Sequence, residues 1–476
     1  MPAFLTGRAG RSIRIRAKTG LARVSSFCCG PRFYSTDGET EKRIIKRDVC
    51  IIGGGATGTF AAIRLRDEGK SAAVVERGPR LGGHTITFQD KVTGAKAEAG
   101  VVVIRDSPVS RKYFSRFNIP LTRFEPPAPD AEVFVDFSTG KQLNYTSQFP
   151  VQTFAAYAAQ LAKYPFLDNG FDLPSTLPED LALPFGEFVK KYDLSPMVLL
   201  TSKLCQGFGD LLSQPTLYVM KNFGSTALRG FAEGFLVPNG FDNSELYNRA
   251  FTELGNDVLL ESTVVSASRE APGRVRVLTR SKSGKETLIK AKKLLITIPP
   301  TVSNLADFDL DAKEMELFSQ FRHTTWWTAI IRNSGLPDNH SITNLSLARP
   351  ENLPSLPAIY EITPTGIPNT LNLKYGSPHS LSEDAVKAEI LRSLARLRRA
   401  SPQLFKSPHS NPEFALFVSH DPFGLTVPVS AINDGFYDKL NSLNGHRSTF
   451  YTGAAYQAHD ASLLFEFTTG LLRKYF

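Results

Sequence analysis

The amino-acid sequence predicts an α/β fold with two domains, the first of which is discontinuous along the chain. Three observations carry this prediction. An apolar run, a glycine-rich turn and a segment of helical spacing follow one another over residues 48–68, an apolar strand recurs at 293–298, and a strand and a helix close the chain over 450–472. A chain of 476 residues also exceeds what one hydrophobic core ordinarily holds.

The first of these segments has the spacing of a Rossmann-like nucleotide-binding turn. The apolar run Val49–Ile52 leads into Gly53-x-Gly55-x-x-Gly58, and a helix pattern follows. In such a turn the first glycine permits the sharp bend, the second lets a pyrophosphate approach the backbone, and the third lets the helix pack on the strand. The alternative is a glycine-rich turn that binds no ligand.

The two ends of this unit suggest which nucleotide it holds. Ala56 and Thr57 begin the helix, whose unpaired N–H groups and dipole favour a phosphate. A second apolar strand, Ala72–Val75, ends at Glu76, whose carboxylate suits a ribose diol and repels a 2′-phosphate. The sequence therefore predicts an unphosphorylated adenosine.

The segment after the second strand separates FAD from NAD. It reads E-R-G-P-R-L-G-G-H and resembles the E-R-x-x-R-x-G-G-R signature of the flavin-containing amine oxidase superfamily. The resemblance implies bound FAD, with the signature residues along its pyrophosphate and flavin: Arg77, Arg80, Gly82, Gly83 and His84. His84 replaces the last arginine, a G-G-H ending that is similar to the β-cyclopiazonate dehydrogenase-like group.

Later segments extend this resemblance. Glu98–Ile104 reads as a strand, and Gly100 is expected to pass close to the flavin ring. The resemblance places Val264, or its neighbour Val265, against the adenine. Gly453 occupies the turn before the last helix, which in the family points its N-terminus at the flavin pyrimidine.

The same patterns set the expected domain boundaries. A Rossmann-like FAD-binding domain and an α+β substrate domain alternate along the chain, because the Pro- and aromatic-rich segments interrupt the nucleotide-binding pattern. The FAD-binding domain is expected at residues 46–119, 230–301 and 415–476, and the substrate domain at 120–229 and 302–414.

Charge is concentrated at the N-terminus. The formal net charge is +9, but residues 1–36 hold seven basic and no acidic residues, so the rest is nearly neutral and nucleic-acid binding is not expected. The arginine-rich leader over residues 1–40, which has no acidic residue before Asp37, has the composition of a mitochondrial transit peptide. A cytoplasmic protein with a basic tail, or a secreted protein, is the alternative. No window of eighteen apolar residues predicts a membrane span.

Candidate catalytic residues are few. His420 ends a strand and could act as a base, although a histidine of the core is the simpler interpretation. Trp326 and Trp327 are adjacent on a strand and must point to opposite faces, so one is expected in the core and the other at a pocket. No lysine occurs between Lys313 and Lys374, where amine oxidases tend to keep one beside the flavin.

The function predicted from these features is that of an FAD-dependent oxidoreductase. It would take a hydride from a small organic substrate, with an oxidative ring closure in secondary metabolism as one such reaction, and pass electrons to oxygen or another acceptor. The FAD is expected to be noncovalent, since no cysteine follows Cys205, and no metal-binding spacing is present. The alternatives are a redox-neutral flavoenzyme similar to UDP-galactopyranose mutase and a non-enzymatic nucleotide-binding protein.

Overall fold

The computed structural model describes residues 43–125, 131–147, 151–407, 409 and 411–476. By its contacts the chain separates into Met1–Glu41 and Lys42–Phe476. The basic leader predicted over residues 1–40 lies outside the described residues. Both large sheets and all the helices that the structure describes belong to the second of these units.

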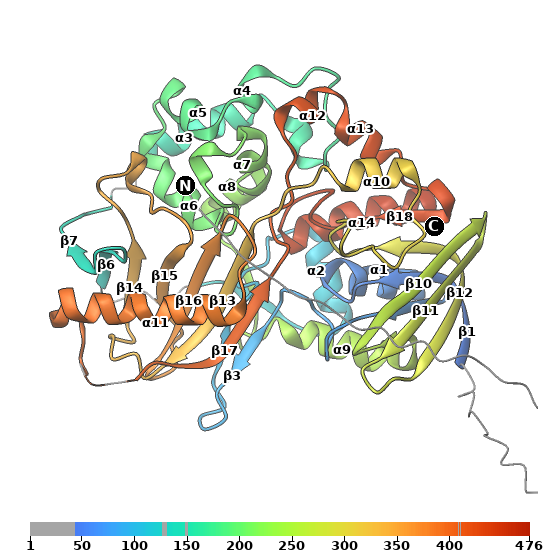
Figure 1. Ribbon diagram of the computed structural model, residues 1–476, viewed down its shortest axis with the longest axis horizontal. Helices are drawn as coiled ribbons and strands as arrows, with labels where there is room; N and C mark the ends of the chain where they lie inside the picture. Colours follow the sequence, from blue (N-terminus) through green and yellow to red (C-terminus); the bar gives the residue numbers. More distant parts are fainter. Residues whose placement is uncertain (1–42, 126–130, 148–150, 408, 410) are drawn as a thin grey trace, which may run out of the picture. The chain divides into compact units, whose positions relative to one another are not determined.

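The first sheet is built around the strand that precedes the glycine-rich turn. Its seven strands run in the order β10-β11-β12-β1-β2-β9, and β18 pairs with β12 as a branch (Figure 1). β1 is parallel to β2 and β12, and β10, β11 and β12 are antiparallel neighbours. The strands are β1 (Arg43–Ile52), β2 (Ala72–Val75), β9 (Val258–Leu259), β10 (Ser262–Ala271), β11 (Arg274–Ser281), β12 (Glu286–Ile296) and β18 (Thr449–Tyr451).

Helices from distant parts of the chain cover this sheet. α1 (Ala56–Asp67) packs against α14 (Ala461–Tyr475) and α9 (Ser244–Leu254), and α2 (Pro108–Arg116) contacts α14. The Phe60 ring of α1 stacks on Phe465 of α14 with centroids 4.9 Å apart. The last helix of the chain is therefore part of the core that supports the first turn.

The second sheet also has seven strands, in the order β17-β13-β16-β15-β14-β6-β7. All neighbours are antiparallel except β14 and β6. α11 (Glu383–Ala400) lies across one face in Figure 1. The strands are β6 (Ala131–Asp136), β7 (Lys141–Leu143), β13 (Thr325–Arg332), β14 (His340–Asn344), β15 (Ala358–Pro364), β16 (Thr370–Ser377) and β17 (Glu413–His420).

Short helices and two small sheets complete the described part of the chain. A helical segment lies between β7 and β8: α3 (Val151–Leu161), α4 (Glu179–Ala182), α5 (Phe185–Lys191), α6 (Val198–Leu204), α7 (Thr216–Asn222) and α8 (Ser225–Glu233). The remaining α-helices and strands are α10 (Ala312–Phe318), α12 (Val429–Asn433), α13 (Phe436–Asn441) and the pairs β3 (Thr87–Gln89) with β4 (Lys96–Glu98) and β5 (Leu121–Arg123) with β8 (Leu236–Pro238). None of the helices described here combines the length and the apolarity needed to cross a bilayer.

Two expectations about local structure need correction. The strand expected over 98–104 ends at Glu98, because the backbone beyond it bends around His84. The domain boundary expected at residue 415 falls inside β17, which pairs with β13 in the second sheet. The continuous apolar run 414–418 of this strand fits either sheet, so the sequence did not reveal its partner.

Candidate active site

The glycine-rich turn after β1 is closely packed. Gly53 has a φ of +103°, and a Cβ atom there would lie 2.7 Å from both Ile298 Cγ2 and Thr297 Oγ1. A Cβ atom at Gly58 would overlap the carbonyl oxygen of Gly53. Only glycine satisfies the bend at the first position and the close contact between helix and turn at the second.

The N-terminus of α1 is open toward this turn. Gly55 is its N-cap, no described side chain caps the helix, and the first turn of the helix, which begins at Ala56 and Thr57, holds no acidic residue. A Cβ atom on Gly55 would meet nothing closer than Gly83 Cα, at 3.9 Å. Unpaired N–H groups at the start of a helix attract an anion, and a bare backbone lets a phosphate come close.

Glu76 stands beside the turn at the end of β2. Its Oε2 accepts a hydrogen bond from Gly54 N at 2.7 Å, and its Oε1 accepts one from Gly78 N at 2.6 Å. The carboxylate is half-buried, and each oxygen keeps a further lone pair for a ribose hydroxyl. Ser262 N, at the start of β10, donates to the Glu76 carbonyl at 2.9 Å, which places Val264 two residues beyond the same corner.

The G-G-H loop lies directly against the glycine turn. Gly82 N donates to Gly54 O at 2.8 Å, and Gly82 and Gly83 have φ values of +106° and +54°. Arg80 donates to three carbonyl oxygens of this loop: Leu81 at 2.9 Å, Thr85 at 2.8 Å and Gly83 at 3.0 Å. Arg80 thus holds the loop in shape, whereas the Arg77 side chain is exposed.

Gly100 packs on the backbone of the same loop. A Cβ atom at Gly100 would overlap His84 O, to which Val101 N donates at 3.3 Å. The close backbone approach expected at Gly100 therefore exists, but its partner is the His84 backbone. Gly453, with a φ of +125°, follows β18 and would place a Cβ atom 3.3 Å from Thr297 O, beside the turn that holds Gly53.

Three histidines from separate segments meet beyond this loop, and we call them, with two aromatic neighbours, the imidazole cluster. The His84 ring lies 4.4 Å from the His420 ring and 6.3 Å from the His459 ring, measured between centroids. Phe423 lies 4.0 Å from His459, and Trp326 lies 5.0 Å from His420. Of the three histidines, His84 is the exposed one and lies at the accessible edge of the cluster.

All three imidazoles are held neutral. Desolvation by the surrounding protein, with the charges of Arg77 and Arg80, lowers the pKa of His84 to about 4. Burial and the neighbouring His84 lower the pKa of His459 to about 3, and burial moves the pKa of His420 well below its usual value. Neutral rings can accept as well as donate hydrogen bonds.

His420 lies at the centre of the cluster. Its side chain is 2% exposed, and its Nε2 lies 3.4 Å from Thr328 Oγ1. Its Nδ1 and the Trp326 Nε1 are buried and have no hydrogen-bond partner among the described residues. Buried polar atoms without partners are uncommon and often mark a place for a ligand or water.

The side chains of the two tryptophans lie on opposite faces of β13, as their adjacent positions predict, and only one of them lies at the site. Trp326 faces the imidazole cluster. Trp327 is 1% exposed and packs with Tyr375 in the core beneath α11, so its suggested role at the pocket is wrong. The second sheet therefore presents one face to the core and the other to the site.

The comparisons with known proteins agree with this geometry. The family model described as "Flavin containing amine oxidoreductase" matches residues 56–410. The chain belongs to this family. The match begins at the start of α1, after Gly53 and Gly55, and covers Gly58, the G-G-H loop and most of the second sheet.

Individual relatives of this flavin-containing amine oxidoreductase cover nearly the whole chain. FAD-dependent oxidoreductase oblC of Cochliobolus heterostrophus is 38% identical over 92% of each chain. Beta-cyclopiazonate dehydrogenase of Aspergillus oryzae is 36% identical over 97% of this chain and 98% of that protein. A CLA-producing fatty acid isomerase from P. acnes has a similar fold, with a TM-score of 0.71, 19% identity and coverage of 90% of this chain and 99% of its own.

These findings confirm the predicted fold class and function. The protein is an FAD-dependent oxidoreductase of the amine oxidase superfamily. The comparisons favour this function over the redox-neutral and non-enzymatic alternatives. The uncapped N-terminus of α1, the bare backbone at Gly55 and the carboxylate of Glu76 suit the pyrophosphate and ribose of FAD.

Several residues of the site escaped the sequence analysis. His459 and Phe423 were not singled out, although the His459-Asp460 pair directly precedes the last helix, where Asp460 accepts from Leu463 N as N-cap. Lys374 was noted only as the end of a lysine-free stretch. It lies opposite Thr328 in register, on the face of Trp326, and pairs with Glu361 at 2.8 Å.

Proposed function

We propose that this enzyme dehydrogenates a small organic substrate of secondary metabolism, and that an oxidative ring closure is the reaction it performs. The relative named beta-cyclopiazonate dehydrogenase, similar over almost the full chain, supports this proposal. Bound FAD supplies the hydride acceptor. The observation that carries the proposal is the neutral imidazole cluster beside the G-G-H loop.

The chain's own contribution is to orient the substrate without charge. His84 is exposed, and its neutral ring can accept a hydrogen bond from an N–H or O–H group of the substrate. Trp326 and Phe423 give the cluster an apolar wall. A substrate carbon that gives up a hydride beside its own N–H or O–H group becomes a cation. A nucleophile of the same molecule can then bond to that carbon and release its proton to a neutral imidazole of the cluster, so that the product has lost two hydrogens in all.

Anaerobic addition of candidate substrates tests the proposal. Purified holoenzyme is mixed with amines, indoles and thioethers while the visible flavin spectrum is recorded. We expect one class to bleach the flavin and to appear in the mass spectrum as a product that is two hydrogens lighter. Bleaching by dithionite but by none of the candidates, or a product of unchanged mass, would contradict the proposed reaction.

Reoxidation of the bleached flavin in the same experiment identifies the electron acceptor. We propose oxygen or another small carrier as acceptor. Admitting air to the bleached enzyme restores the yellow colour within a catalytic cycle if oxygen is used. If colour returns only when an added quinone or other acceptor is present, oxygen is excluded.

A further inference from the structure

The turn between β18 and α14 carries His459 into the imidazole cluster, and we call residues 453–460 the His459 turn. Its own backbone closes it, because Tyr456 N and Gln457 N both donate to Gly453 O, at 3.0 Å and 3.2 Å. Bonds within the turn fix its shape. Its place in the site depends on contacts with other segments.

Lys221, near the end of α7, holds one side of the His459 turn. Its side chain is 3% exposed, and its Nζ donates to Leu167 O at 2.6 Å, to Gly170 O at 2.7 Å and to Gln457 Oε1. Gln457 Nε2 donates in turn to Asp168 O at 2.9 Å. An ammonium only donates and a carbonyl only accepts, so the Gln457 amide has one orientation and is held at both ends.

The three acceptors around Lys221 match an ammonium group. A protonated lysine has three N–H donors, whereas a neutral amine has two. Burial lowers the pKa of Lys221 to about 7, and the charge of Asp168 opposes this change. The Nζ atom also lies 4.9 Å from the centroid of the Phe171 ring, a favourable place for a cation. Below its pKa the buried cation is therefore fully hydrogen-bonded.

Asn222, the next residue of α7, holds the other side of the turn. Its Oδ1 accepts from His459 N at 3.3 Å, and its Nδ2 donates to Tyr218 O at 2.9 Å. Lys221 and Asn222 are thus adjacent in the sequence and contact the turn two residues apart, at Gln457 and at His459. We call this pair the α7 clamp.

The His459 ring itself is tied to the backbone of Phe423. Burial lowers the pKa of the imidazole, and the hydrogen bond to Phe423 opposes this change, so the ring N–H is the donor in that bond. The Phe423 N–H already donates to Thr324 O at 2.8 Å, which leaves the Phe423 carbonyl oxygen as the acceptor. The other nitrogen of the neutral ring therefore carries a lone pair and can take up a proton.

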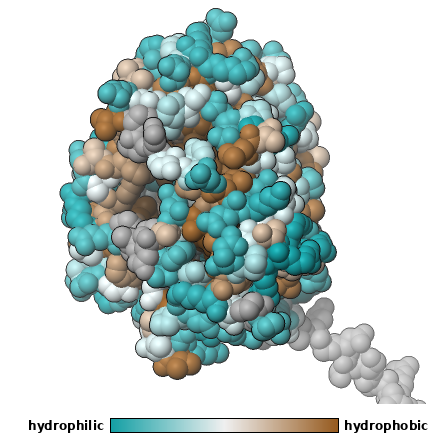
Figure 2. Space-filling model, turned by 90° about the vertical axis from the view of Figure 1, so that its left-hand side faces the viewer, coloured by the Kyte–Doolittle hydropathy of each residue, from teal (hydrophilic) through white to brown (hydrophobic). Residues whose placement is uncertain are grey.

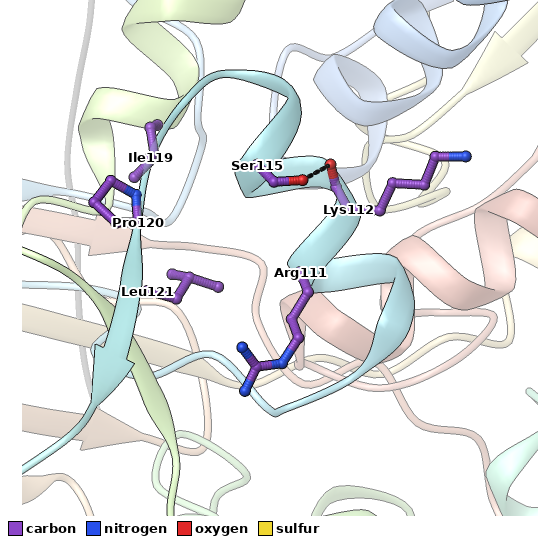
Figure 3. Close-up of a pocket in the computed structure, with 6 residues that line it drawn as sticks. All are labelled: Arg111, Lys112, Ser115, Ile119, Pro120 and Leu121. Carbon is purple, nitrogen blue, oxygen red and sulfur yellow. Dashed lines mark hydrogen bonds between the residues drawn. The ribbon is translucent and has the colours of Figure 1, made fainter.

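Two hollows in the described part of the chain lie apart from this arrangement. A cavity of about 680 Å³ lies between the helical segment and the second sheet, and Figure 2 shows a hollow on that side of the protein. Its wall toward the cluster is closed, because Gly207 packs directly against Phe423 and Trp326. A smaller hollow of about 250 Å³ beside α2 is lined by Arg111, which already pairs with Asp106 at 2.5 Å (Figure 3). Neither lining includes a residue of the imidazole cluster.

We propose that Lys221 and Asn222 are positioning residues of this enzyme, and that the α7 clamp holds the His459 turn so that the His459 ring stays in the imidazole cluster with one nitrogen free to take up a proton. The two residues act through His459 and not on the substrate. This assignment rests on the proposed function for the proton that ring closure releases, but the position of His459 can be measured without any substrate.

Carbethoxylation of the holoenzyme with diethyl pyrocarbonate, which reacts with neutral imidazoles, tests the assignment. The rate at each histidine is read by peptide mass spectrometry at about pH 6, below the pKa of Lys221. We expect Lys221→Met and Asn222→Ala each to raise the rate at His459 about fivefold, because each loses hydrogen bonds that hold the turn. The rate at His340, a half-buried histidine of β14, should not change. The matched control is Lys439→Met, the same change at an exposed position of α13.

The conservative variant Asn222→Asp keeps an acceptor of the same shape for His459 N and should retain the slow rate. Unchanged rates at His459 in folded Lys221→Met and Asn222→Ala overturn the assignment. Equal acceleration at His459 and His340 overturns it as well, because that result shows a general loosening of the fold. If Lys221→Met fails to fold, Asn222→Ala, which leaves the bonds of Lys221 in place, decides by the same two rates. If His459 responds as expected but no substrate class bleaches the flavin, only the proposed dehydrogenation fails.

Discussion

At the scale of single residues, the three histidines of the imidazole cluster make the folded protein sensitive to acid. In the unfolded chain a histidine has a pKa of about 6.5. If the pKa is lower in the folded protein, the free energy of unfolding has its full value above pH 6.5. Part of that free energy is lost as the pH falls, because the unfolded chain binds the proton more readily. Of the three histidines, His420 is expected to contribute most to this pH dependence, since it is 2% exposed and its pKa is lowered well below the usual value.

Replacing His420 by glutamine should therefore flatten the acid limb of the stability curve. Between about pH 7.5 and about pH 5 we expect the free energy of unfolding of the unmodified enzyme to fall by up to about 2 kcal/mol more than that of His420→Gln. Urea unfolding at the two pH values measures the difference. His409→Gln, at an exposed position, serves as the control and should keep the full slope. Parallel curves for the enzyme and His420→Gln would contradict this expectation.

The residues of the nucleotide turn could be predicted from the sequence, whereas the imidazole cluster could not. Gly53, Gly58 and Glu76 lie within one strand-helix-strand unit, so their spacing along the chain fixes their geometry. His84 and His459 come from opposite ends of the chain and meet only because α14 packs on α1. No local pattern encodes a contact of that kind.

At the scale of elements, the N-terminus of α1 lacks a capping side chain that would stabilise the helix, and this leaves its N–H groups free to bind an anion. The helix begins at Gly55 without a capping side chain, although a Cβ atom there would meet nothing closer than 3.9 Å. Gly55 has an extended backbone, with φ of −70°, that any residue adopts. An aspartate would cap the helix, and its charge would then occupy the place where the pyrophosphate is expected.

Gly55→Asp should consequently keep the fold and lose the cofactor. We expect the stability of the apoprotein to stay the same or rise by a few tenths of a kcal/mol. FAD affinity should fall by tenfold or more, about 1.4 kcal/mol. Flavin content after purification and fluorescence titration of the apoprotein with FAD give the result. Gly55→Asn has the same shape without the charge, so equal FAD affinity of the two variants would show that the helix end does not face the phosphates.

The second sheet shows why a side chain's neighbours across strands matter more than its position in the sequence. The sequence has no lysine from 314 to 373, where the family tends to keep one, but strand pairing places Lys374 opposite Thr328. Residues paired in this way share a face, so Lys374, Thr328 and Trp326 all face the site, while Trp327 faces α11. The alternation could be predicted, and the pairing could not.

At the scale of the whole molecule, every strand of both large sheets lies within Lys42–Phe476. The fold class followed from the first strand-helix-strand unit, because its glycine spacing is specific. The placement of β17 did not follow, because it depends on which of two sheets accepts an apolar strand. The prediction for the leader rests on composition alone, since residues 1–36 carry seven of the nine net positive charges.

We propose that the leader directs the protein to mitochondria, and a fusion of residues 1–40 to a fluorescent protein in yeast tests this. Import into mitochondria depends on the positive charge of the leader, and residues 1–36 hold no acidic residue that would offset it. The fusion should therefore colocalise with a mitochondrial dye, and a variant in which Arg8, Arg11, Arg14 and Arg16 become glutamine should be diffuse, because that change removes four of the seven charges and keeps the length. Diffuse fluorescence of the unmodified fusion, or equal import of the two fusions, would show that the leader is a basic tail and not a mitochondrial targeting signal.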